Sequence, residues 1–358
     1  MFSKFAAIVS QMFKSTFIRP FFLFPLIKIL TIGVFISGCE PPNRYLVDIG
    51  QTNVNLSVLQ LETDLFLAAE DGISVEDVAM LKEKYGAFFE LFSSQIIGLG
   101  STDNPSFPVY LEHSPSATTE LEIADSVNRV FGGFEIYRLE LAEAFDRYHY
   151  FFPEKSIPTV YTFISAFSYT IVADSGMLGI GLDKYLGGNC SFYDRLGIPA
   201  YKRHQMNPDN LLVDALKSWL YTEYQDDNQQ PDLLGQLIYA GKLQVALDAL
   251  FPEHEATLKF GFTPEQLIWC EENEANIWFH FVDNDLLYKQ DRQLFVKYLQ
   301  DAPFTPGFPE GSPGRVGQWL GWRIVSTYME KMNSLDVHAM MLADPDDILR
   351  KSGYKPKR

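Results

Sequence analysis

The sequence is poor in cysteine and lacks the short motifs that mark the commonest catalytic sites. It has three cysteines in 358 residues. After Cys39, only Cys190 and Cys270 remain, which is too few for a zinc spacing, a Cys-x-x-Cys pair or a small disulfide framework. There is also no glycine-rich phosphate loop and no Gly-x-Ser-x-Gly segment, so the strongest cues for nucleotide binding and for a serine hydrolase are absent. We expect Cys190 and Cys270 to be buried thiols, although only their separation decides whether they pair.

Histidine is equally scarce, with six residues scattered along the chain. The best match to a zinc peptidase helix is residues 254–258, His-Glu-Ala-Thr-Leu, in which leucine stands where the second histidine is needed. One imidazole cannot supply the ligand pair, so we interpret this match as chance. Glu271, Glu272 and Glu274 offer carboxylates for acid–base or metal chemistry, but a solvated acidic face is the preferred explanation. The sequence predicts neither a metal nor a cofactor.

Basic residues are outnumbered, with 29 Lys and Arg against 46 Asp and Glu and a formal net charge of −17. Residues 1–38 hold four basic residues and no acidic one, so the rest of the chain is more acidic still. Such a field repels nucleic acid, and we predict no nucleic-acid partner. The exception is residues 350–358, a basic tail that we expect to be solvated.

The N-terminal segment predicts membrane attachment. A short apolar run follows Lys28 and leads into Ser37 and Gly38 directly before Cys39. Small residues before a cysteine, behind an apolar stretch with upstream basic residues, are typical of a bacterial lipoprotein signal peptide over residues 1–38. Cys39 would then be the lipidated first residue, tethering the protein to a membrane on its extracytoplasmic, periplasm-facing side. The alternative is an uncleaved transmembrane anchor, which requires Lys28 to snorkel.

The remaining chain predicts a short linker and one large folded region. Residues 39–53 are expected to form the linker, followed by a domain over residues 54–349. Near-alternating or β-branched segments predict strands, and apolar residues at helical spacing predict helices. We expect strands at 54–61, 159–164, 169–172 and 178–182, and helices at 74–97, 119–150 with a break at Gly132-Gly133, 210–224, 233–250, 264–281, 291–299 and 316–332. These segments predict a mainly helical α+β fold with one small sheet.

The segment from Ser312 to Arg323 contains three glycines, two tryptophans and two arginines. Glycines at these positions permit the backbone to approach another helix or a ligand closely. It is therefore the leading candidate for a cleft wall. For the tryptophans, core packing is the competing explanation.

Several separate segments resemble one known family. They are Gly181-Leu182-Asp183-Lys184-Tyr185-Leu186-Gly187, Ile198-Pro199-Ala200-Tyr201, Leu237-Ile238-Tyr239-Ala240-Gly241-Lys242, Asn273-Glu274-Ala275-Asn276-Ile277-Trp278 and Gly321-Trp322-Arg323-Ile324-Val325. In this order, from about residue 50 to residue 332, they resemble the gliding-motility lipoprotein GldB family. The resemblance implies an envelope lipoprotein whose partners are other envelope motility proteins and the associated secretion apparatus.

The GldB family is also distantly similar to predicted zinc peptidases of the gluzincin type, which implies a zincin-like fold. Its active helix would fall near 211–221 and its downstream glutamate helix near 233–250. Here the corresponding stretches, residues 213–218 and 238–242, contain no histidine pair and no glutamate. A lone Asp214 cannot hold zinc, because about three protein ligands are needed. We therefore predict a metal-less pseudoenzyme without catalytic residues.

In this interpretation the former catalytic cleft serves as a binding groove. Its candidate walls are Asp214 on one side and Trp319, Trp322 and Arg323 on the other. Two alternatives remain open: a metal-dependent hydrolase with unrecognised ligands, and an envelope lipoprotein that binds a peptide or glycan.

Overall fold

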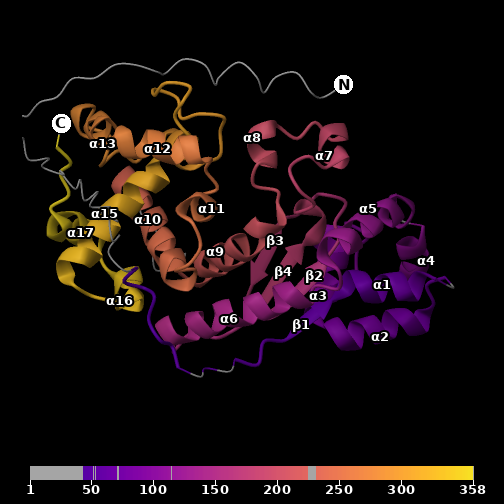
Figure 1. The fold of residues 1–358 in the computed structure, drawn as a ribbon. Coiled ribbons are helices and arrows are strands. Elements are labelled where there is room, and N and C mark those ends of the chain that lie inside the picture. The colour runs from indigo at the N-terminus through magenta and orange to yellow at the C-terminus, as the bar shows by residue number, and fades with distance from the viewer. Residues whose placement is uncertain are drawn as a thin grey trace, which may run out of the picture. The chain divides into compact units, whose positions relative to one another are not determined.

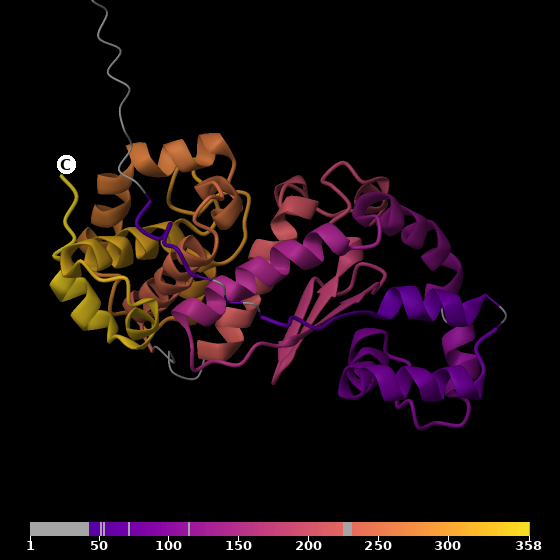
Figure 2. The same cartoon turned by 60° about the horizontal axis from the view of Figure 1, so that its bottom comes forward.

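The computed structural model describes residues 43–50, 52, 54–70, 72–113, 115–224 and 231–357, with residues 115–121 described by their backbone alone. The predicted signal peptide and Cys39 lie outside these residues. From Asn43 onward the chain forms one compact unit. Figure 1 shows its central sheet, with the indigo N-terminal helices on one side and the orange and yellow C-terminal helices on the other. Figure 2 shows the same arrangement from a second direction.

The sheet has four short strands within the described residues, in the order β1-β2-β4-β3. They are β1 (Val58–Gln60), β2 (Thr159–Phe163), β3 (Ile171–Asp174) and β4 (Met177–Gly181). β1, β2 and β4 are parallel, and β3 runs antiparallel to β4 along one edge. Val160 of β2 pairs with Val58 on one side and Leu178 on the other, which fixes the register.

Alternating residues of β2 contribute to two different cores. Val160, with Leu178 and Ile180 of β4, belongs to the larger core, whereas Tyr161 and Phe163 belong to the smaller one. Because successive side chains of a strand point to opposite faces, the sheet separates these two clusters. Both faces are therefore covered, as expected for a largely parallel sheet.

The smaller core lies against the N-terminal helices. These are α1 (Leu61–Ala69), α2 (Val75–Tyr85), α3 (Ala87–Leu91), the π-helical turn η1 (Phe92–Ile96) and α4 (Phe107–Glu112). Phe88 of α3 stacks on Tyr161 of β2, with ring centroids 4.1 Å apart. Gly179 of β4 makes room for this contact, because a Cβ there would lie 2.7 Å from the Phe88 ring.

The larger core is formed mainly by the helices that follow. They are α5 (Pro115–Phe131), α6 (Glu135–Phe151), η2 (Leu182–Lys184), α7 (Ser191–Arg195), α8 (Ala200–Arg203), η3 (Pro208–Asn210), α9 (Leu211–Tyr224), α10 (Leu233–Leu250), α11 (Ala256–Phe260), α12 (Pro264–Glu272), α13 (Glu274–Asp283), α14 (Arg292–Leu299), α15 (Val316–Met332), α16 (Val337–Leu342) and α17 (Pro345–Ser352). α10 is buried on nearly all sides and packs most extensively on α15. The predicted mainly helical α+β fold with one small sheet is confirmed.

The folded unit extends further in both directions than the sequence indicated. Within the expected linker 39–53, Asn43 donates a hydrogen bond to the carbonyl of Pro252 at 2.6 Å, and Tyr45 is buried. At the other end α17 continues to Ser352, and Tyr354 is buried against the domain. The linker and the basic tail that were expected from the sequence therefore each include residues that pack on the folded unit.

Two basic residues of the predicted tail also have acidic partners. Arg350 and Lys351 both form ion pairs with Asp347, one turn earlier on α17. Within the described part of the chain, no helix is long and apolar enough to cross a membrane.

Candidate functional site

A pocket of about 690 Å³ lies where α9, α8 and the residue just before α15 meet the loop before β3 and the turn after β4. Figure 1 shows α8 above β3, with α9 beside this edge strand. The lining residues are Phe167, Thr170, Lys184, Tyr185, Leu196, Gly197, Ile198, Pro199, Lys202, Gln205, Met206, Asp214, Lys217, Asp301 and Arg315. Six separate segments of the chain thus supply one site.

Helix α9 contributes two charged side chains to this pocket. Asp214 and Lys217 are three residues apart, so both lie on the same face of the helix. The hydroxyl of Tyr185 donates a hydrogen bond to Oδ2 of Asp214 at 3.0 Å. Burial raises the pKa of Asp214 to about 6, and the positive charge of Lys217 opposes that shift. Asp214 is therefore mostly ionised at neutral pH.

Lys217 is a half-buried cation whose ammonium is held by a neutral group. It donates a hydrogen bond to the side-chain oxygen of Gln318 at 3.3 Å. Gln318 in turn donates its amide hydrogen to the carbonyl of Leu299 at 2.8 Å, which orients that oxygen toward Lys217. Burial, followed by the nearby positive charge of Arg315, lowers the pKa of Lys217 to about 8.

Arg315 occupies the position just before α15 with a strained backbone. Its φ is +61°, in the left-handed region that residues with a side chain rarely adopt. Its Nε pairs with Oδ1 of Asp301 at 2.9 Å, and its guanidinium also donates to the carbonyl of Phe260 at 3.0 Å. Gly314, directly before Arg315, lets the backbone of this segment lie against that of Ala302, because a Cβ on Gly314 would be 2.3 Å from the carbonyl oxygen of Ala302.

A second strained segment also reaches the pocket through Phe167. Ala166 and Phe167 have φ values of +50° and +68°. The buried carboxylate of Asp183 holds this turn by accepting hydrogen bonds from the backbone N–H groups of Ser165 and Phe167. The ammonium of Lys184 donates to the carbonyl of Phe167 at 3.1 Å. Strained backbone held by surrounding contacts is typical of functional sites.

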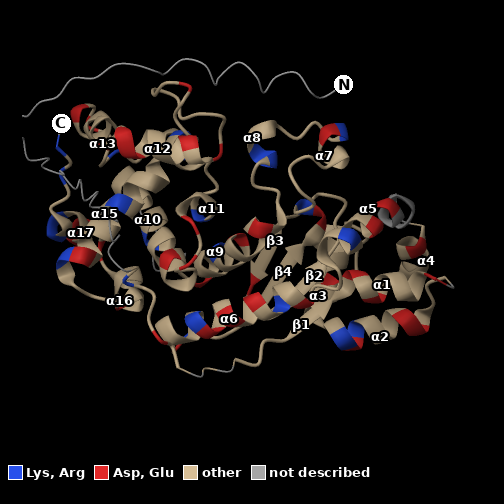
Figure 3. Ribbon diagram, viewed as in Figure 1, with Lys and Arg blue, Asp and Glu red and all other residues tan. Residues whose placement is uncertain are grey.

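The charge of the pocket is opposite in sign to that of the chain. Its lining includes the cations Lys184, Lys202, Lys217 and Arg315 but only the carboxylates of Asp214 and Asp301. The chain as a whole has a formal net charge of −17. In Figure 3, red ribbon segments mark Asp and Glu on many of the helices, and a blue segment marks a basic residue on α8. The pocket is therefore a local cationic site within an acidic protein.

Of the four side chains proposed from the sequence as cleft walls, Asp214 lines this pocket. Trp319 is fully buried in the larger core. The indole of Trp322 donates to Oδ2 of Asp248 at 2.7 Å. Arg323 pairs with Glu274 at 2.9 Å. The structure does not bring these three residues of α15 to the pocket, because their side chains are buried in the core or bonded to residues of other helices.

Sequence reasoning missed the cations of the site. Arg315 belongs to the segment that was singled out, but Trp319, Trp322 and Arg323 were selected there instead. Lys217 carried a signal of its own, since it interrupts an otherwise apolar face of a buried helix. Lys184 and Lys202 carried none, because isolated lysines in loops and short helices are usually solvated.

The other acidic and histidine motifs have structural roles or lie elsewhere. Glu274 pairs with Arg323 and accepts a hydrogen bond from the Tyr354 hydroxyl at 2.7 Å. His254 and Glu255 line a different pocket, of about 460 Å³. Among the residues that the structure describes, no group of three or more His, Cys, Asp or Glu side chains is placed to hold a metal ion.

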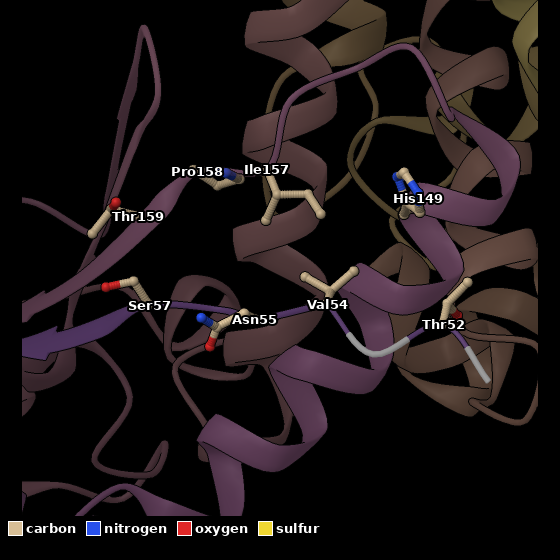
Figure 4. A pocket seen from close by; sticks show the side chains of 8 residues that line it. All are labelled: Thr52, Val54, Asn55, Ser57, His149, Ile157, Pro158 and Thr159. Atoms are coloured by element: carbon tan, nitrogen blue, oxygen red, sulfur yellow. The ribbon is translucent and has the colours of Figure 1, made fainter.

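A further pocket of about 420 Å³ lies between the segment before β1 and the end of α6. Figure 4 shows its lining residues, among which His149 is the titratable one. The others are small polar or apolar: Thr52, Val54, Asn55, Ser57, Ile157, Pro158 and Thr159. This pocket lacks the charge concentration of the α9 pocket, and we do not assign it a role.

Comparison with known proteins supplies the family. No curated protein and no solved structure gives a significant match to the chain. The sequence does match the family described as gliding motility protein GldB over residues 42–356. The matched region begins one residue before the folded unit and ends two residues before the C-terminus. The chain belongs to the GldB family of gliding motility proteins.

Proposed function

We propose that this protein is a membrane-anchored lipoprotein of the gliding motility machinery and its associated secretion apparatus, acting through a binding groove and not through catalysis. Its family membership supports the motility role. The anchor rests on the sequence around Cys39, which precedes the folded unit closely. Asn43 follows Cys39 by four residues, so fully extended chain between them spans at most about 14 Å, and the domain would lie close to the membrane surface.

The observation that carries the non-catalytic part is the chemistry of the α9 pocket. The family's distant resemblance to gluzincins places the metal-binding helix near residues 211–221, which is α9. The side chains that α9 contributes to the pocket are Asp214 and Lys217, and Arg315 faces them. Ammonium and guanidinium groups repel a divalent ion, and catalytic zinc needs about three protein ligands. This lining suits a binding groove better than a metal centre.

The arrangement of helices is consistent with the proposed zincin-like architecture. α9 packs against β3 and β4, and α10 packs against α9 in turn. The resemblance assigns the active helix and the glutamate helix to these two elements. α10 contains Gln236, Gln244 and Asp248 but no glutamate.

Metal analysis of the purified full-length protein tests the non-catalytic proposal. We expect no stoichiometric zinc and no change in melting temperature on addition of a chelator. Zinc at one equivalent, lost together with a hydrolytic activity on chelation, would instead establish the alternative metal-dependent hydrolase.

Cell fractionation and gliding assays test the anchor and the motility role. A strain lacking the gene should lose gliding, and the wild-type gene should restore it. The Cys39→Ala variant should move from the membrane to the soluble fraction and fail to restore gliding. Cys190→Ala is the matched control and should behave as wild type. Normal gliding of the deletion strain would refute the motility role and favour an envelope protein that binds a peptide or glycan.

A further inference from the structure

The α9 pocket contains more positive than negative side chains, although the protein is acidic. Burying charge without a partner is costly, and proteins normally offset it with paired groups or a bound ion. Lys184, Lys202, Lys217 and Arg315 face two carboxylates, of which Asp301 is paired with Arg315. Lys202 is exposed to solvent, and Lys184 lies beside the buried carboxylate of Asp183. Lys217, in contrast, is half-buried and forms no ion pair within the described part of the chain.

We propose that this pocket binds a compact anionic group, a carboxylate or a phosphate, on a ligand that also has an apolar part. The proposal rests on the binding groove proposed above and names the chemistry of its ligand.

Lys217 and Arg315 are positioned to contact such an anion. Lys217 is held by the neutral oxygen of Gln318 at 3.3 Å, and no ion pair within 4.0 Å joins it to a carboxylate in the described part of the chain. Its ammonium can therefore donate to an anion without first breaking an ion pair. Arg315 spends its Nε and one terminal nitrogen on Asp301 and Phe260. Its planar guanidinium has further donors, which suit a carboxylate or phosphate.

The apolar part of the ligand follows from the remaining walls. Phe167, Leu196, Ile198, Pro199 and Met206 line the side contributed by the β2–β3 loop and the α7–α8 region. At about 690 Å³, the pocket has the size of a small-ligand or peptide-end site. A peptide terminus with an apolar last residue combines both features. We therefore expect a peptide carboxylate to bind more tightly than an inorganic anion.

The site is held rigidly before any ligand arrives. Arg315 and Phe167 line the pocket with left-handed backbone, and each is fixed by hydrogen bonds to neighbouring segments. Preorganised donors bind an anion without the cost of ordering them. We attribute the left-handed backbone of Arg315 and Phe167 to this positioning of the pocket walls.

Anion affinity should depend on pH through the groups that face Lys217. These are Asp214 on the same helix, Lys184 and Tyr185 after β4, Lys202 on α8, Asp301 after α14 and Arg315 before α15. As the pH rises through about 8, Lys217 loses its charge and affinity should fall. As the pH falls through about 6, Asp214 becomes neutral and affinity should rise.

Calorimetric titration of the full-length protein in detergent tests the proposal. One probe is inorganic sulfate, whose charge is constant over the pH range used. The other is a short peptide with a C-terminal leucine and a free carboxylate, compared with the same peptide as its C-terminal amide. Lys217→Met removes the charge at nearly constant volume. Lys289→Met removes an exposed lysine outside the pocket and is the charge-matched control.

We expect the free carboxylate to bind at one site per chain and the amide to bind at least tenfold more weakly. Lys217→Met should lose at least tenfold in affinity for both anions and should lose the fall in sulfate affinity above about pH 8. Lys289→Met should change neither. Binding of sulfate but not the peptide would support an anion site and assign it to phosphate-type groups.

Absence of binding by either probe would overturn the proposal, as would equal binding by wild type and Lys217→Met. A melting curve for Lys217→Met shows whether the variant is folded, and the pH dependence of the wild type needs no variant. These outcomes are independent of gliding. A protein that binds no anion but is required for gliding would refute this inference alone, and the reverse result would refute the motility role alone.

Discussion

Gly241 of α10 and Gly321 of α15 bring the backbones of two buried helices into direct contact. A Cβ on Gly321 would lie 1.8 Å from the carbonyl oxygen of Leu237, and one on Gly241 would lie 2.2 Å from the carbonyl carbon of Gly321. The glycines of the segment 312–323 were interpreted from sequence as permitting close approach to a helix or a ligand. At Gly321 the close contact is with a helix, α10.

Gly321→Ala should therefore destabilise the protein. Alanine favours a helix over glycine by about 1 kcal/mol, but overpacking against rigid backbone costs about 3 kcal/mol or more. We expect a net loss of at least about 2 kcal/mol in the free energy of unfolding, measured by urea denaturation. Gly311→Ala is the control, because its Cβ would meet Trp269 at an ordinary 3.6 Å. Equal stability of the two variants would contradict the direct helix contact.

Glu62 predicts a specific pH dependence of stability. It is a buried carboxyl at the start of α1, and the hydroxyl of Thr162 donates to its two oxygens at 2.8 and 2.9 Å. Burial raises its pKa from 4.5 to about 7. The folded state thus holds the proton more tightly than the unfolded state. This contribution to stability is fully present below about pH 4.5 and is lost as the pH rises through about 7.

Glu62→Gln removes the titration and keeps an acceptor for Thr162. Between about pH 5 and pH 8, the free energy of unfolding of the wild type should fall by up to about 3 kcal/mol more than that of the variant. The pKa values of Asp183 and Asp214 are also raised by burial, to about 6, so the variant keeps a smaller slope. Parallel curves for the two proteins would show that Glu62 is not protonated in the folded state.

Local sequence signals predicted much of the fold. The helix expected from residue 74 begins as α2, where Ser74 forms a capping box with Asp77. Asp232 starts α10, and the expected bounds 233–250 and 316–332 match α10 and α15. These helices could be predicted because their caps and apolar spacing are encoded within a few residues. The break between α5 and α6 falls at Gly132-Gly133, as predicted.

Other boundaries depend on contacts that are distant in sequence. The helix expected over 74–97 is interrupted at Gly86, whose φ of +53° ends α2 before α3 begins. The strand expected over 54–61 is confined to Val58–Gln60, because only these residues pair with β2. Between the helices expected over 74–97 and 119–150, where no element was predicted, the structure has α4, whose Phe107 is fully buried in the smaller core. Tertiary packing overrides local pattern at each of these places.

The sequence predicted less of the site than of the fold, for the same reason. Asp214 was selected because a family resemblance pointed to α9. Lys217, Arg315 and Lys184 become one charged group only when α9, α15 and the turn after β4 meet. The residue spacing within one segment does not show which distant segments it will contact.

Trp322 tests whether the tryptophans of α15 serve packing and hydrogen bonding. Its indole donates to Asp248, and the other carboxylate oxygen of Asp248 pairs with the buried Lys259 at 2.5 Å. Trp322→Phe removes one hydrogen bond to a charged acceptor and should cost about 2 kcal/mol of unfolding free energy. Asp248→Ala should cost more, about 3 to 5 kcal/mol, because it leaves the Lys259 charge unpaired.

Neither substitution should alter anion binding at the α9 pocket, since neither residue lines it. Titration of the peptide carboxylate into Trp322→Phe is the measurement. A tenfold loss of affinity in a folded variant would return Trp322 to the binding site proposed for it from the sequence.

The three cysteines provide a chemical test of the anchor. In the structure Cys190 and Cys270 are both free thiols; Cys270 is buried as expected, whereas Cys190 is half-buried, because it lies just before the short surface helix α7. Burial raises the pKa of the Cys270 thiol, which further slows its reaction as thiolate. In the native protein a water-soluble thiol reagent should therefore label Cys190 much faster than Cys270.

After denaturation without reductant, protein extracted from membranes should show two reactive thiols, because lipidation of Cys39 consumes the third as a thioether. Protein produced without lipidation should show three. Three thiols in the membrane-extracted protein would contradict a lipid-modified Cys39, and one or none would indicate that Cys190 and Cys270 are oxidised.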